Sequence, residues 1–192
     1  GHTAWYALAE ECRLRAGQTV LVQGSGGVSV FALQIAKAIG AKVVATSSSD
    51  EKLERMRELG ADWLVNYRTH PDWEREVLRL CGGVDATIDV GGEATLARAV
   101  ACANTDGFIT VVGVLGGFGA APLSVFDVMQ KNLTVKGVTV GCRESLERLC
   151  RFVEQHDIRP VISHRFAAGE LAAATALLER GQHFGKISIA VA

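Results

Sequence analysis

A glycine-rich loop is the part of this sequence best suited to chemistry. Residues 24–29 read Gly-Ser-Gly-Gly-Val-Ser, directly after a short β-branched run and before a helical pattern. In that context Gly24 permits a tight turn, and Gly26 lets a pyrophosphate approach the backbone. The start of the helix adds free N–H groups and a favourable dipole. The pattern predicts dinucleotide binding by Gly24, Ser25, Gly26, Gly27 and Val28. A glycine turn that binds nothing is the alternative.

Four residues at the ends of the second and third apolar runs point to the kind of dinucleotide. An NAD site usually has an acid about 20 residues past the glycine loop, whereas this sequence has Ser47. A serine hydroxyl can donate to a 2′-phosphate that a carboxylate would repel, and Lys52 can supply the countercharge. Tyr67 and Arg68 end the third run and can reach the same pocket. We therefore expect NADP(H) to be preferred over NAD(H), with Ser47, Ser48, Lys52 and Tyr67 at its phosphate.

Two other interpretations of this segment remain open. Asp50 could be the ribose acid of an NAD site, although its position better suits a helix start. Ser48 and Glu51 have the spacing of a capping box, which is compatible with phosphate binding.

The remaining reactive side chains favour structural roles. The five histidines lack a metal-ligand spacing, and the five cysteines form an odd set without a C-x-x-C pair. Asp85 and Asp89 flank a buried-looking strand, where structural roles are expected over acid/base catalysis. A hydrolase elbow is missing. Neither Tyr6 nor Tyr67 is followed at four residues by the lysine of a short-chain dehydrogenase.

The elements that must position these residues alternate along the chain. Short apolar runs predict strands, and the amphipathic stretches between them predict helices. The fold class expected is α/β, a Rossmann-type doubly wound six-stranded parallel sheet in the order 3-2-1-4-5-6 with helices on both faces. The predicted strands are 19–23, 42–46, 64–66, 84–90, 108–112 and 134–140. The predicted helices are 28–39, 50–59, 72–80, 94–103 and 122–131. The tail predicts helices at 144–154 and 171–180 and extended segments at 161–166 and 186–191.

Composition narrows the function classes. The chain has 192 residues, a net charge of −1 and 48% hydrophobic residues, so we expect one domain, 1–192. Near-neutral charge gives no basis for nucleic-acid binding or an anionic membrane, and no apolar run has the length of a membrane span. We expect a cytoplasmic protein with reduced thiols. The Gly1-His2 start, without a Met or a signal peptide, indicates an excised piece of a longer protein.

In their order and spacing, these segments resemble the cofactor domain of the medium-chain dehydrogenase/reductase superfamily. The branch they are most similar to contains the NADP-dependent alcohol dehydrogenases and quinone oxidoreductases. The stretches that carry the resemblance are residues 3–5, the loop 22–29, ATSSSDEKLERMRELGA at 45–61, Asn-Tyr-Arg at 66–68, Asp-Val-Gly-Gly at 89–92, Val-Gly-Val at 112–114 and His-Phe-Gly-Lys at 183–186.

The resemblance implies roles for further residues. Val90 and Gly91 would border the adenine side, and Val112 and Val114 would line the nicotinamide. Lys186 matches a Gly-Lys motif near the family's C-terminus. The sixth strand, Thr134 to Val140, would pair across a two-fold axis to form a homodimer.

The resemblance also implies a part that is missing from this sequence. Family members have an N-terminal barrel-like, GroES-like catalytic domain that holds the substrate pocket and the zinc ligands. Zinc is not expected on this fragment, and zinc-dependent and zinc-free parents both stay open. The parent would transfer hydride between the cofactor and a carbonyl, alcohol, enone or quinone. The alternatives are a non-enzymatic dinucleotide-sensing domain and a methyltransferase-like sheet; Ser47 argues against the latter.

Overall fold

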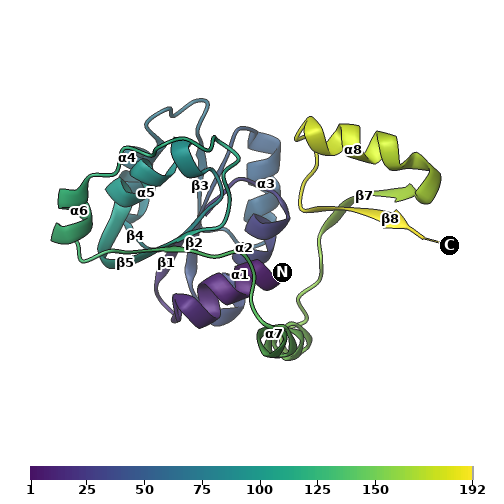
Figure 1. Ribbon diagram of the computed structural model, residues 1–192, viewed down its shortest axis with the longest axis horizontal. Helices are drawn as coiled ribbons and strands as arrows, with labels where there is room; N and C mark the ends of the chain where they lie inside the picture. Colours follow the sequence, from purple (N-terminus) through teal and green to yellow (C-terminus); the bar gives the residue numbers. More distant parts are fainter. Residues whose placement is uncertain (192) are drawn as a thin grey trace.

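Six parallel strands form the central sheet of the computed structural model, which describes residues 1–191 (Figure 1). Their order is β3-β2-β1-β4-β5-β6, and each neighbouring pair is parallel. This confirms the predicted doubly wound α/β fold. The strands are β1 (Thr19–Gln23), β2 (Lys42–Ser47), β3 (Trp63–Asn66), β4 (Val84–Asp89), β5 (Ala103–Val111) and β6 (Thr134–Gly137).

Helices cover both faces of this sheet. One face carries α1 (His2–Trp5), a π-helical turn (Tyr6–Glu11), α2 (Gly27–Ile39) and α3 (Asp50–Glu58), with α7 (Arg143–Gln155) packed outside them. The other carries α4 (Trp73–Cys81), α5 (Leu96–Cys102) and α6 (Val125–Gln130). A 3-10 turn (Gly92–Ala94) precedes α5.

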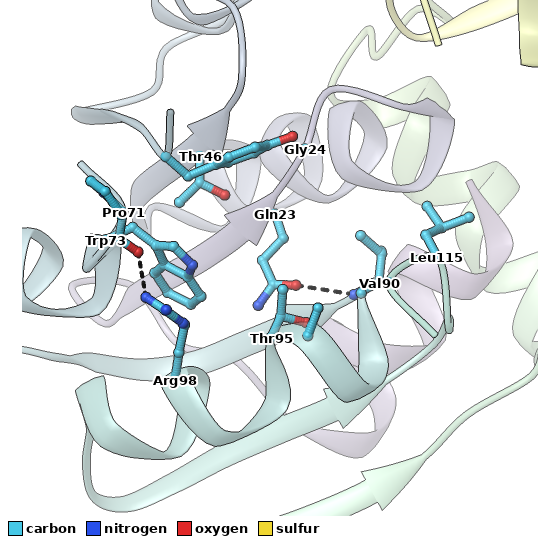
Figure 2. A pocket seen from close by; sticks show the side chains of 13 residues that line it. Gln23, Gly24, Thr46, Pro71, Trp73, Val90, Thr95, Arg98 and Leu115 are labelled. Atoms are coloured by element: carbon cyan, nitrogen blue, oxygen red, sulfur yellow. Dashed lines mark hydrogen bonds between the residues drawn. The ribbon is translucent and has the colours of Figure 1, made fainter. Parts of the chain in front are cut away.

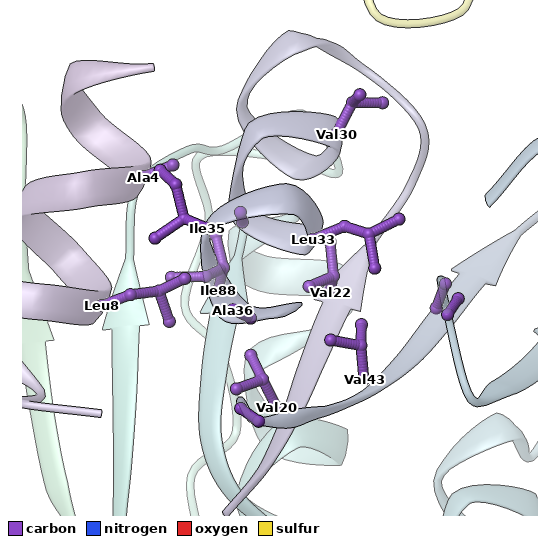
Figure 3. Packing of buried hydrophobic residues seen from close by; sticks show 14 of the residues in the cluster. Ala4, Leu8, Val20, Val22, Val30, Leu33, Ile35, Ala36, Val43 and Ile88 are labelled. Carbon is purple, nitrogen blue, oxygen red and sulfur yellow. The ribbon is translucent and has the colours of Figure 1, made fainter. Parts of the chain in front are cut away.

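The two faces have separate cores because strand side chains alternate in direction. In β1, Val20 and Val22 pack with Leu33 and Ile35 of α2, as Figure 3 shows. Leu21, between them, packs on the opposite face with Trp73 and other residues of that core. Burial on both faces explains why β1 is a continuous apolar run.

The centre of the sheet is where the chain changes direction. From β1 the crossovers lead through β2 to β3 on one side, and the chain then returns to β4 on the other side of β1. The loops after β1 and β4 therefore diverge at the carboxyl edge of the sheet. In open α/β sheets a crevice for ligands forms at such a switch point.

The tail forms a second, smaller sheet. β7 (Ile162–Ala167) and β8 (Lys186–Ala190) pair in parallel and are connected through a 3-10 turn (Ala168–Glu170) and α8 (Leu171–Glu179). Figure 1 shows this unit beside α3, with the segment from α8 to β8 facing the main sheet. A β-bridge joins Gly185 to Gly26 of the glycine loop, and the Gly185 N–H donates to the Ser25 carbonyl at 2.9 Å. The Gly-Lys segment near the C-terminus therefore lies against the glycine loop near the N-terminus.

Three boundaries differ by three residues or more from those predicted. The sixth strand, expected over 134–140, ends at Gly137, because its neighbour β5 ends at Val111 and the Thr139 carbonyl accepts a hydrogen bond from the Thr3 hydroxyl instead. The helix expected over 122–131 starts only at Val125, where Ser124 caps it. The fifth strand begins at Ala103 rather than at Phe108, which shortens the preceding helix.

Candidate functional site

Each glycine of the loop has a different physical role. Gly24 has a φ of +72°, a left-handed conformation that β-branched residues avoid. Gly26 has an ordinary extended backbone, and a Cβ placed there would meet open space. At Gly27 a Cβ would lie 2.4 Å from Cε of Lys186. The first glycine makes the turn, the second leaves an open cradle and the third lets Lys186 lie across the loop.

The loop leads into the exposed N–H groups of α2. Gly26 is the N-cap and offers no side chain, so the first turn has donors without intrahelical partners. Ser29, at the third position of the motif, is buried, and its hydroxyl donates to the Gln23 carbonyl at 2.6 Å. This bond fixes the helix against the strand. Lys186 adds a positive charge beside Gly27, so the start of α2 is suited to an anion.

The residues predicted at the end of β2 gather beside this loop. Ser47, Ser48, Lys52 and Tyr67 line a hollow of about 630 Å³ together with the whole glycine loop. We call it the glycine-loop hollow. Ser47 is 3% exposed, and its hydroxyl accepts a weak bond of 3.4 Å from the Ser49 N–H. The Lys52 ammonium donates to the Gly181 carbonyl of the turn after α8. Burial lowers the pKa of Lys52.

The helix cap in this segment is a correction. Ser49, and not Ser48, is the N-cap of α3, because its hydroxyl accepts a hydrogen bond from the Lys52 N–H at 3.3 Å. The capping box proposed for Ser48 and Glu51 is therefore wrong. Asp50 lies in the first turn of α3, and its carboxylate accepts a bond from the Asn66 amide. Ser48 instead faces the hollow.

A second hollow of about 480 Å³ continues from the first and is shown in Figure 2. We call it the Trp73 hollow. Pro71, Trp73 and Arg98 gather at one end of it, and Arg98 is held by the Pro71 carbonyl and by Glu74 at 2.8 Å. The residues that line both hollows are Gln23, Gly24, Tyr67, Val90 and Leu115. The two hollows together suit an extended ligand with an anionic part and a flat, less polar part.

The loop after β4 is held by a buried acid. Asp89 is fully buried and accepts hydrogen bonds from the Gln23 amide at 3.0 Å, the Gly92 N–H at 2.8 Å and the Thr95 hydroxyl at 2.8 Å. The Gln23 amide oxygen in turn accepts from the Val90 N–H. This network joins the ends of β1 and β4, so Asp89 has a structural role. It places Val90 and Gly91 on the wall of the Trp73 hollow.

Two predicted residues lie elsewhere. Val112 packs partly against the core, and Val114 packs against Gly92 while remaining 41% exposed. Neither lines one of the two hollows; the next residue, Leu115, lines both. The nicotinamide role of Val112 and Val114 stays a prediction.

Several lining residues were missed by sequence reasoning. Gln23 and Thr46 end β1 and β2, and their position beside the motif could have indicated them. Others come from distant segments, and no local pattern marks them. They are Pro71, Trp73, Arg98 and Leu115, and, from the tail, Leu178, Glu179, Gly181 and His183.

Neither a metal-binding cluster nor a membrane-spanning helix is found among the described residues. Among residues 1–191, no three His, Cys, Asp or Glu side chains converge as a metal site would require. No helix in that range has both the length and the apolarity to span a membrane.

Comparisons with known proteins identify the family of this chain. Residues 27–155 match the family described as zinc-binding dehydrogenase. This chain belongs to the zinc-binding dehydrogenases of the medium-chain dehydrogenase/reductase superfamily. It is 37% identical to a zinc-type alcohol dehydrogenase-like protein of Schizosaccharomyces pombe, over 98% of this chain and 57% of the relative. The chain therefore spans little more than half the length of such a relative. It corresponds to the cofactor-binding part of that protein.

Solved structures show the same relationship. A protein of Sinorhizobium meliloti 1021 described as an alcohol dehydrogenase superimposes with a TM-score of 0.93 and 44% identity, covering 99% of this chain and 55% of that one. An NAD-dependent alcohol dehydrogenase gives 0.91 at 36% identity, with coverages of 100% and 56%. A quinone oxidoreductase of Thermus thermophilus, also solved with NADPH, gives 0.78 at 28%, with coverages of 98% and 62%. Similar proteins thus include both NAD and NADP users.

Proposed function

We propose that this cofactor-binding domain prefers NADP(H) and serves a dehydrogenase or reductase acting on a carbonyl, alcohol, enone or quinone. The observation that carries the preference is the end of β2. Ser47 and Ser48 line the glycine-loop hollow there, with the Lys52 ammonium on the same wall. Hydroxyl donors beside a cation suit a phosphate on the adenosine ribose, whereas an NAD site has an acid at this position.

The rest of the crevice would hold the pyrophosphate, the adenine and the nicotinamide of the cofactor. Gly26 and the start of α2 would hold the pyrophosphate, with Lys186 as countercharge. The Trp73 hollow, with Pro71 and the fixed guanidinium of Arg98, would take the adenine. Val112, Val114 and Leu115 would border the nicotinamide. When bound, that ring supplies or accepts the hydride, and the protein positions it.

The proposal assigns other tasks to residues outside this chain. The relatives it matches are nearly twice as long. The substrate walls, and the zinc ligands of a zinc-dependent parent, would come from that additional part. We also propose that the parent is a homodimer joined through β6, which is an edge strand with four exposed residues.

NAD(H) is the second candidate, because Glu179 at the end of α8 also lines the glycine-loop hollow. A carboxylate there could accept bonds from ribose hydroxyls and would repel a phosphate. This acid comes from α8 rather than from β2. Its effect can therefore be separated from that of Ser47.

Calorimetric titration of the chain with NADPH and NADH at pH 7.5 tests the proposal. We expect tighter binding of NADPH, with an advantage of about tenfold or more for a charge-assisted contact. The advantage should shrink as salt rises. Equal affinities would remove the NADP preference, and a Glu179→Gln variant that gains affinity only for NADPH would show why. If neither nucleotide binds, the assignment of the two hollows is wrong.

A further inference from the structure

The turn between α8 and β8 brings a histidine to the cofactor crevice. His183 lines the glycine-loop hollow together with Ser47, Ser48 and Lys52. It lies about 130 residues from these partners in the sequence. Figure 1 shows the segment from α8 to β8 facing α3, the helix that carries Lys52.

The backbone around His183 is fixed by contacts to β7, α3 and the glycine loop. Phe184 is 1% exposed, with the Arg55 guanidinium 4.1 Å from its ring centre. The Phe184 N–H donates to the Ser163 hydroxyl at 3.3 Å, and the Gly185 N–H donates to the glycine loop. On the other side, the Gly181 carbonyl accepts from the Lys52 ammonium. His183 is thus held between two anchors and does not sit on a free loop.

One nitrogen of this histidine has no partner. Nδ1 is shielded from solvent and makes no hydrogen bond within the described chain. A buried polar atom without a partner costs free energy unless a ligand or water satisfies it. The Lys52 ammonium, with three donors, can keep the Gly181 carbonyl and still bind a ligand. His183 and Lys52 line the same hollow, so both side chains are placed to bind one anion.

We infer that His183, as an imidazolium, is a specificity-determining contact for a phosphate monoester on the adenosine ribose. The inference rests on the proposed function and extends it, because it adds a wall to the phosphate site that β2 and α3 begin. Lys52 supplies a permanent charge from one side. His183 supplies a charge that forms only when the phosphate arrives.

The electrostatics of the free site fit this role. Burial lowers the pKa of His183, and the positive charges nearby lower it further. The free imidazole is therefore neutral near pH 7. A dianionic phosphate beside it favours the charged form and raises the pKa, so binding takes up a proton. The contribution of the charged imidazole to phosphate binding is fully present below the pKa of His183 in the free protein. It is lost as pH rises through the pKa of His183 in the complex. The charged or titratable groups around it are Lys52, Glu179, His164, Lys186 and Tyr67.

Two small nucleotides isolate the phosphate in question. Adenosine 2′,5′-bisphosphate and adenosine 5′-monophosphate differ only in the 2′-phosphate. At pH 7.0, we expect His183→Ala to weaken binding of the bisphosphate about tenfold and that of the monophosphate less than twofold. Thermal melts of the free proteins control for folding. Equal losses with both nucleotides, or no loss with either, would overturn the inference.

Proton uptake gives a readout that a merely structural histidine would not affect. Titrations in buffers of different ionisation enthalpy measure it directly. We expect the wild-type chain to take up more of a proton with the bisphosphate than with the monophosphate at pH 7.0. His183→Asn should abolish that difference, while Lys52→Arg, which cannot lose its proton, should retain it. An undiminished difference in His183→Asn would refute the imidazolium. If the wild-type chain binds NADPH and NADH while His183 variants behave normally, only this inference fails; if it binds no adenosine nucleotide, the proposed function fails too.

Discussion

At the scale of single residues, the loop shows why motif glycines are not equivalent. A side chain at Gly26 would enter open space, whereas one at Gly27 would have to displace the flexible end of Lys186. The space beside the first position is free in the folded chain, as the proposed pyrophosphate site requires. The second is already used by the protein itself.

This difference gives the first prediction. Gly26→Val should leave the melting temperature nearly unchanged, because its side chain meets nothing in the protein. It should abolish dinucleotide binding, because the side chain fills the cradle where a pyrophosphate approaches. Calorimetry and thermal melts measure the two effects. Gly27→Val is the comparison variant: it must displace the flexible end of Lys186 and should weaken dinucleotide binding by moving that positive charge away from the loop. Retained affinity in Gly26→Val would show that the anion binds elsewhere.

We expect Ser47 to contribute to the discrimination between NADPH and NADH. Ser47→Asp should reduce the ratio of NADPH to NADH affinity by about tenfold or more, because a carboxylate repels the phosphate and accepts from ribose hydroxyls. Because Ser47 is 3% exposed, the variant must be compared with Ser47→Ala in a thermal melt. An unchanged ratio in Ser47→Asp would remove Ser47 from discrimination.

At the scale of elements, the residue at which α3 begins decides which serine caps the helix and which serine lines the glycine-loop hollow. Ser49 caps the helix, so Ser48 is free to face the hollow. We expect Ser49→Ala to lower the free energy of unfolding by about 1 kcal/mol, the usual value of an N-cap. Ser48→Ala should change it by less than about 0.5 kcal/mol. Urea unfolding at pH 7 measures both, and equal losses would contradict the assignment of the cap.

At the scale of the whole molecule, an ion pair ties the N-terminal helical segment to α7. The Arg148 guanidinium donates to both Glu10 carboxylate oxygens, at 2.9 and 2.8 Å, and the Trp5 indole donates to the same group at 2.8 Å. The hydrogen bond from Arg148 holds the pKa of Glu10 at about 2, below its ordinary value of 4.5. The contact therefore joins segments that are far apart in the sequence.

The sign of the pH effect follows from that lowered pKa. A carboxyl with a lower pKa in the folded state stabilises the fold above about pH 4.5, and the contribution is lost as pH falls toward 2. Glu10→Gln should thus destabilise by about 1 kcal/mol at pH 7. Urea unfolding should show the gap between the two proteins narrowing from pH 5 to pH 3. A gap that is constant over that range would rule out the titration of Glu10 as its cause.

The proposed dimer is also a property of the whole molecule. The exposed edge of β6 should pair with a second copy. Val135→Lys would place like charges near the two-fold axis and should shift sedimentation from dimer to monomer. Leu146→Lys, at an exposed apolar position of α7, is the control and should leave the assembly unchanged. A dimer that persists in Val135→Lys would exclude this edge.

The sequence by itself determined the sheet order and the glycine loop. Both depend on local patterns: apolar runs that a buried parallel strand requires, and small residues where a turn and a helix start meet. The structure confirms that order and places Ser47, Ser48, Lys52 and Tyr67 around one hollow.

Only the tertiary structure decided where β6 ends, which serine caps α3 and what closes the crevice. The end of β6 depends on the length of β5, and the cap depends on where Ser49 lies relative to the Lys52 N–H. Gly181 and His183 line the glycine-loop hollow from the C-terminal tail. The β-bridge between Gly26 and Gly185 holds that tail beside the hollow. Such contacts between distant segments depend on the packing of the whole chain, so no local spacing in the sequence encodes them.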